Sequence, residues 1–92
     1  MNTSHLRIDP HDSADDLDLV EVYRLRRRLT TYADELHNWA MAEPDVALMR
    51  RMVEREAVVR KSVAASFDAV AARQAAGAVR LLRLAVESHR LD

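Results

Sequence analysis

Cysteine is absent from this chain of 92 residues, and turn-forming residues are scarce, with one glycine and two prolines. The lack of cysteine excludes a disulfide framework, a thiolate nucleophile and zinc bound through sulfur. It also fits a reducing compartment, so we expect a cytoplasmic protein. The scarcity of glycine and proline argues against a β fold with many turns.

Long apolar runs are missing as well. No stretch approaches the roughly 18 apolar residues that a membrane-spanning helix requires, so we expect no membrane partner. The first ten residues, MNTSHLRIDP, contain neither an apolar core nor a cleavage site. We therefore expect no secretory signal.

Aromatic residues are few (one Phe, one Trp and two Tyr), although apolar residues make up 49% of the chain. The apolar content is Ala, Val, Leu and Met, which is typical of a core between helices. A chain of this length forms one domain and buries only about 60–65% of its unfolded surface, so a monomer would be marginally stable. We predict an all-α fold that self-associates, either an antiparallel helical hairpin or a three-helix bundle.

Charge is divided unevenly along a chain whose net charge is −1. Residues 1–21 hold six acids and one arginine, whereas residues 22–92 hold thirteen basic residues and nine acids. Residues 1–12 show no apolar periodicity, and we predict a flexible acidic tail there, followed by a single helical domain at 13–92. Alternatively, the acidic segment folds over the basic part of the bundle.

The first helix is predicted at residues 13–41. Ser13 and Asp16 have the spacing of a capping box, and acidic residues in a first turn favour the helix dipole. No glycine or proline follows until Pro44. Pro44 suits the first position of a second helix, which leaves a turn at 42–43.

Within that helix, apolar residues alternate in steps of three and four, the spacing of a heptad seam in a coiled coil. They are Val22, Leu25, Leu29, Tyr32, Leu36 and Trp39. Arg26 and Arg28 border the seam, so we expect them to influence partner choice through flanking ion pairs. Trp39 either packs against the turn or inserts into a partner's pocket.

The second helix is predicted as one long element at residues 44–90, because a single glycine inside a helix costs only about 1 kcal/mol. A bend or break near residues 74–77, around Gly77, is the alternative. One long helix would extend roughly 28 Å beyond the first at about 1.5 Å per residue. Its apolar side chains would then have to be covered by a third helical segment or by a second copy.

Small residues form a second apolar face on the long helix. Ala64, Ala71, Ala75 and Ala78 recur there with Phe67 and Leu82, and small side chains allow close helix approach. Together with the heptad seam, this face defines the predicted interface. Its members are Val22, Leu25, Arg26, Arg28, Leu29, Tyr32, Leu36, Trp39, Phe67, Ala71, Ala75, Ala78 and Leu82.

Residues that carry chemistry are sparse. Asp34 and His37 are spaced i, i+3, but they fall on the predicted solvent face, and Glu54 and Glu56 have no histidine partner at that spacing. His89 is expected to interact with the negative end of its helix. We predict no metal, no cofactor and no catalytic residue in this chain.

The sequence therefore favours a small oligomeric protein, most simply a homodimer, that acts through protein–protein contacts as an adaptor, regulatory subunit or assembly factor. The alternative is a nucleic-acid-associated protein whose arginines contact phosphates. A third hypothesis is an enzyme whose site forms only between subunits.

Overall fold

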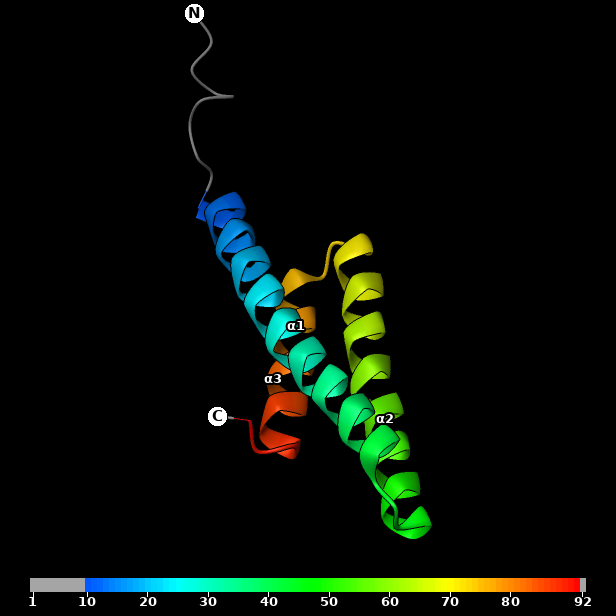
Figure 1. Cartoon of the computed structure of the whole chain (residues 1–92). Coiled ribbons are helices and arrows are strands. Elements are labelled where there is room, and N and C mark those ends of the chain that lie inside the picture. Colours follow the sequence, from blue (N-terminus) through cyan, green and yellow to red (C-terminus); the bar gives the residue numbers. More distant parts are fainter. Residues whose placement is uncertain (1–9, 92) are drawn as a thin grey trace, which may run out of the picture.

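The computed structural model describes residues 10–91, which form three helices (Figure 1). They are α1 (Pro10–Ala42), α2 (Val46–Ala71) and α3 (Ala75–Ser88). α1 and α2 form a hairpin that is narrow at its turn and widens toward the far end of α2. α3 returns along the wide end and packs on both long helices. The all-α prediction is confirmed, and the described residues form a three-helix bundle.

The start of α1 differs from the prediction. The helix begins at Pro10 and not at residue 13, so Ser13 lies inside it and is not its N-cap. Proline is compatible with a first helical turn because its missing N–H would have no partner there. Residues 1–9 of the predicted tail lie outside the described residues.

The α1–α2 turn depends on Asp45, the N-cap of α2. Asp45 Oδ1 accepts hydrogen bonds from the backbone N–H groups of Ala47 at 2.9 Å and Leu48 at 3.2 Å. Pro44 therefore precedes the helix and is not its first residue. The carboxylate decides this boundary because it satisfies two backbone donors that have no partner within the helix.

An unbroken helix over 44–90 is wrong, and the alternative of a break near 74–77 is closer, because the chain turns at residues 72–74. Arg73 has a φ of 60°, and its N–H donates to Val70 O at 2.9 Å. Gln74 N–H donates to Ala69 O at 2.8 Å. This pair of bonds is a Schellman motif, which normally places glycine in the left-handed position. Gly77, where the sequence suggested a break, lies inside α3.

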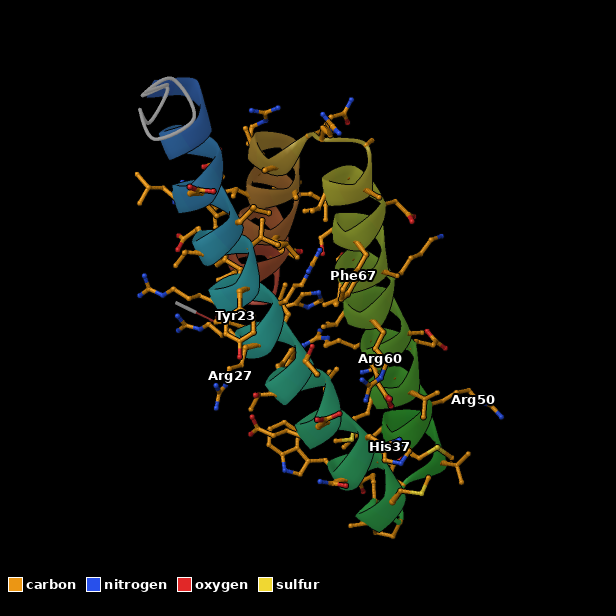
Figure 2. All side chains as sticks on the ribbon, turned by 90° about the horizontal axis from the view of Figure 1, so that it is seen from above. Tyr23, Arg27, His37, Arg50, Arg60 and Phe67 are labelled. Atoms are coloured by element: carbon orange, nitrogen blue, oxygen red, sulfur yellow. The ribbon has the colours of Figure 1, made fainter. Side chains whose placement is uncertain are left out.

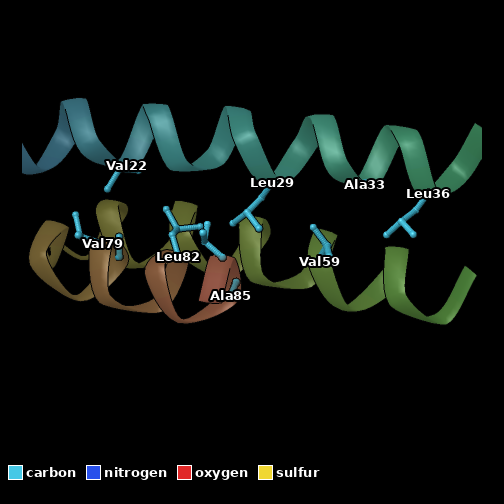
Figure 3. Close-up of a cluster of buried hydrophobic side chains, with 10 residues drawn as sticks. Val22, Leu29, Ala33, Leu36, Val59, Val79, Leu82 and Ala85 are labelled. Carbon is cyan, nitrogen blue, oxygen red and sulfur yellow. The ribbon is translucent and has the colours of Figure 1, made fainter. Parts of the chain in front are cut away.

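The core lies where the three helices meet (Figure 3). It combines α1 and α3 side chains with one α2 valine, and its members are Val22, Leu29, Ala33, Leu36, Val59, Ala78, Val79, Leu82, Ala85 and Val86. Leu29, Leu82 and Val59 are completely buried. Each such side chain stabilises the fold by roughly 1.5–3 kcal/mol. The turn at 72–74 thus provides one of the two predicted covers for this apolar surface, a third helical segment of the same chain.

Candidate interaction surface

A groove runs between α1 and α2 on a side that α3 does not line. We call it the Tyr23–Phe67 groove; it has a volume of about 530 Å³ and is lined by Tyr23, Arg26, Arg27, Thr30, Thr31, Val63 and Phe67. Tyr23 is 63% exposed and Phe67 is 56% exposed. Figure 2 shows the two rings on the same side of the hairpin. Two aromatic rings thus remain in solvent beside a hollow of partly apolar character.

Arg26 lines this groove and contacts both Ser66 and Phe67 of α2. Its Nε donates to Ser66 Oγ at 2.7 Å, and its Cζ lies 3.6 Å from the centre of the Phe67 ring. Ser66 is completely buried and donates its hydroxyl hydrogen to Val63 O at 2.6 Å. A hydroxyl and an aromatic face thus hold the guanidinium, by a hydrogen bond and a cation–π contact.

The charge of Arg26 has no acidic partner within residues 16–91. Its Nη2 is buried and makes no hydrogen bond to any residue that the structure describes. Burial lowers the pKa of Arg26 from its ordinary value, but an arginine stays protonated at neutral pH. The groove therefore contains a positive charge that a carboxylate from outside could complement.

Next to the groove, a polar network joins α1 to α2. Arg60 donates to Glu56 at 2.7 Å and to Asp34 at 2.9 Å, and His37 Nδ1 lies 3.3 Å from Glu56 Oε1. The hydrogen bond from Arg60 holds the pKa of Glu56 below its usual range, and the Glu56 and Asp34 carboxylates raise the pKa of Arg60. Glu56 and Asp34 thus act as ion-pair partners of Arg60. Among the described residues, no group of three His, Asp or Glu side chains could hold a metal ion.

A second hollow, the Trp39 groove, lies beyond the end of α3 and has a volume of about 340 Å³. It is lined by Tyr32, Leu36, Trp39, Leu48, Arg51, Met52 and Arg55. Trp39 is 49% exposed. The tryptophan therefore lines an open hollow near the turn.

The predicted interface residues fall into three groups. The seam residues Val22, Leu29 and Leu36 are buried in the core, as are Ala75, Ala78 and Leu82 of the small-residue face. Leu25 and Tyr32 are half-buried against that core. Trp39, Phe67 and Ala71 remain exposed. The turn at 72–74 explains this division, because it places the two halves of the small-residue face on different helices.

Arg26 and Arg28, which border the predicted heptad seam, have different environments. Arg26 takes part in the α1–α2 contact through Ser66 and Phe67. Arg28 is exposed and donates to the Leu91 carbonyl oxygen, which links the end of α3 to α1. Both therefore contribute to contacts within the chain.

His89 lies at the carboxyl end of α3, where the sequence analysis expected it to interact with the helix dipole. It is the C-cap residue of α3, and its ring centre lies 5.7 Å from that of Tyr32. Burial, aided by the charge of Arg55, lowers the pKa of His89.

Sequence reasoning missed Tyr23, Val20 and Ser66. Tyr23 and Val20 lie outside the heptad seam, and the search for a seam passed over them. Their exposure becomes visible only once the opposite face of α1 is known to be buried. Nothing in the sequence around Ser66 indicates that its hydroxyl accepts a hydrogen bond from Arg26.

No protein-family model matches this chain, and no similar protein was found among curated proteins or solved structures. Among the helices of the described residues, none combines the length and the apolar character needed to span a lipid bilayer.

Proposed function

We propose that this protein acts through protein–protein contacts, as a small oligomeric adaptor, regulatory subunit or assembly factor. The observation that carries the proposal is the pair of half-exposed rings, Tyr23 and Phe67, beside a groove that Arg26 lines. Aromatic residues and arginine are enriched among the residues that dominate binding energy at protein interfaces.

Further exposed apolar residues support the same proposal. Val58, Leu48 and Val46 on α2 are each at least 40% exposed, and so are Leu17, Leu19 and Val20 on α1. Single exposed apolar residues are ordinary, but Leu48 lines the Trp39 groove and Leu19 lines a further hollow of about 180 Å³. Contact with another protein would remove this surface from water.

The test is the mass of the purified chain by light scattering, from micromolar to millimolar concentration, with thermal unfolding at each concentration. We expect a species heavier than the monomer and a midpoint of unfolding that rises with concentration, because association stabilises only the folded state. A monomer at every concentration that also retains no protein from its native lysate would overturn the proposal.

Nucleic-acid association remains the second candidate, favoured by one arrangement of arginines. Arg24, Arg27 and Arg28 line a common hollow of about 410 Å³, which Leu91 beyond the end of α3 also lines. Glu35 lines it too, and Glu21 lies 3.8 Å from Arg24. These acids weaken an attraction for phosphate.

Retention of duplex DNA at low salt separates the two candidates. If phosphate contacts are the function, the double variant Arg24→Gln, Arg28→Gln should lose binding and show a shallower salt dependence. We expect the unmodified chain to show no salt-sensitive retention.

A further inference from the structure

A stripe of four residues on α1 has a self-complementary pattern. Asp16, Val20, Tyr23 and Arg27 are separated by steps of four, three and four, which places them on one face of a helix. All four are exposed, Val20 by 57% and Tyr23 by 63%. Tyr23 and Arg27 also line the Tyr23–Phe67 groove, so the stripe is continuous with that hollow.

The spacing of the stripe reads the same in both directions, whereas its charges are opposite at its two ends. If two copies of α1 run antiparallel, Asp16 of each faces Arg27 of the other, and Val20 of each faces Tyr23 of the other. If they run parallel, Asp16 faces Asp16 and Arg27 faces Arg27. Like charges in direct opposition are unfavourable, so only the antiparallel arrangement is complementary.

We propose that two copies of this chain form a twofold-symmetric dimer by antiparallel pairing of α1 over this stripe. The inference rests on the proposed function and names its partner, a second copy, and its contact face. A twofold interface uses the same patch on both subunits, which a stripe of palindromic spacing provides. Helices in contact lie about 8–10 Å apart, a distance that arginine and aspartate side chains bridge together.

The groove arginines support this choice of occupant. Arg26 and Arg27 both line the groove, and within residues 16–91 no carboxylate forms an ion pair with either of them. In the dimer, Asp16 of the second copy lies beside Arg27. The exposed Phe67 ring flanks the same groove. The second copy thus supplies a negative charge for Arg27 and apolar cover for Tyr23.

Disulfide trapping tests the register, since the chain has no cysteine of its own. A mixture of the Asp16→Cys and Arg27→Cys chains is oxidised at high protein concentration, and each chain is also oxidised alone. We expect a mixed disulfide dimer and little Asp16→Cys homodimer. In the proposed register the two residues at position 16 are roughly 16 Å apart along the helices, beyond disulfide reach.

Charge reversal provides an independent test that needs no cross-link. Asp16→Arg and Arg27→Asp should each raise the dimer dissociation constant roughly ten-fold, since each alters two symmetry-related pairs. The double variant should recover most of the affinity. Glu35→Arg, an exposed change on α1 outside the stripe, serves as the control and should leave the dissociation constant unchanged.

The outcomes separate this inference from the function on which it rests. An Asp16→Cys homodimer without the mixed dimer shows parallel pairing and overturns the inference alone. A dimer that neither cross-links nor responds to charge reversal uses another face, which also overturns only the inference. A chain that stays monomeric at every concentration overturns the dimer, and the further absence of any protein partner overturns the proposed function.

Discussion

Arg26 brings a charged side chain into the contact between α1 and α2. The buried hydroxyl of Ser66 accepts its Nε hydrogen, and the Phe67 ring covers its other side. These contacts satisfy part of the guanidinium and fix the register of the two helices. Ser66 therefore has a structural role as the hydrogen-bond partner of Arg26.

Ser66→Ala removes the acceptor of Arg26 Nε in a partly buried place. We expect the free energy of unfolding to fall by about 1 kcal/mol, the net contribution of a typical hydrogen bond. Urea denaturation followed by circular dichroism measures it. Ser62→Ala is the matched control, because Ser62 bonds only Val58 O of its own helix, and its effect should stay within about 0.5 kcal/mol.

His89 makes stability depend on pH near neutrality. Burial and the charge of Arg55 lower the pKa of His89 in the folded state. Below the ordinary pKa of about 6.5, His89 is therefore protonated in the unfolded chain while it is still mostly neutral in the folded chain. The contribution of neutral His89 to the free energy of unfolding is fully present above about pH 6.5 and is lost as pH falls through the pKa of the folded state. We expect His89→Phe, which keeps a ring beside Tyr32, to lose less stability than the native chain between about pH 7.5 and pH 5.5. Equal losses in the two proteins would contradict this assignment.

At the scale of the helices, three residues are poorly suited to their backbone conformation: Gly77 inside α3, and Arg73 and Arg90, which both have a positive φ. Gly77 lies inside α3, where glycine is poorly suited, and an added Cβ would meet Gln74 Cβ at 3.7 Å and Arg80 Nη2 at 3.8 Å. Both are ordinary contact distances. Arg73, by contrast, adopts the left-handed conformation that glycine accepts most readily.

Gly77→Ala should raise the free energy of unfolding by about 0.5–1 kcal/mol, because alanine loses less backbone freedom in a helix and finds room here. Chemical denaturation measures the change. Ala76→Gly is the matched comparison, because it adds a second glycine at an exposed position of the same helix. This variant should lower the free energy of unfolding by about 1 kcal/mol. A destabilising Gly77→Ala would mean that the neighbouring side chains cannot accommodate a methyl group.

Arg73→Gly should also stabilise the fold, by about 1 kcal/mol, since it relieves the left-handed conformation of a residue with a Cβ. The variant should retain three helices by circular dichroism. A fall in stability would show that the Arg73 side chain makes a contribution larger than the backbone cost.

Sequence reasoning located the two long helical regions and the seam on α1, because an apolar period of three and four persists over many turns. It did not find the turn at 72–74, since the left-handed residue there is arginine and the only glycine lies three residues into α3. It also assigned the seam on α1 to an interface with a partner, whereas Val22, Leu29 and Leu36 are buried in the core of the same chain. Periodicity shows that Leu29 faces a helix, but it does not show whether that helix belongs to the same chain.

At the scale of the whole molecule, the location of Leu29 changes how association has to be tested. Leu29 is completely buried in the core, so a charge there would unfold the monomer and report nothing about a partner. The residues that inform on association are those left exposed once the three helices have packed. Among them, Tyr23 lies at the middle of the proposed contact face on α1.

The most direct measurement is the light-scattering mass of the Tyr23→Asp chain beside that of the native chain, with helicity recorded for both. Leu84→Asp is the matched control, because Leu84 is 66% exposed on α3, away from the groove. We predict that Tyr23→Asp gives a folded monomer, whereas the Leu84→Asp chain associates as the native chain does. A Tyr23→Asp chain that keeps the native mass and helicity would contradict the proposal that this face binds a second copy.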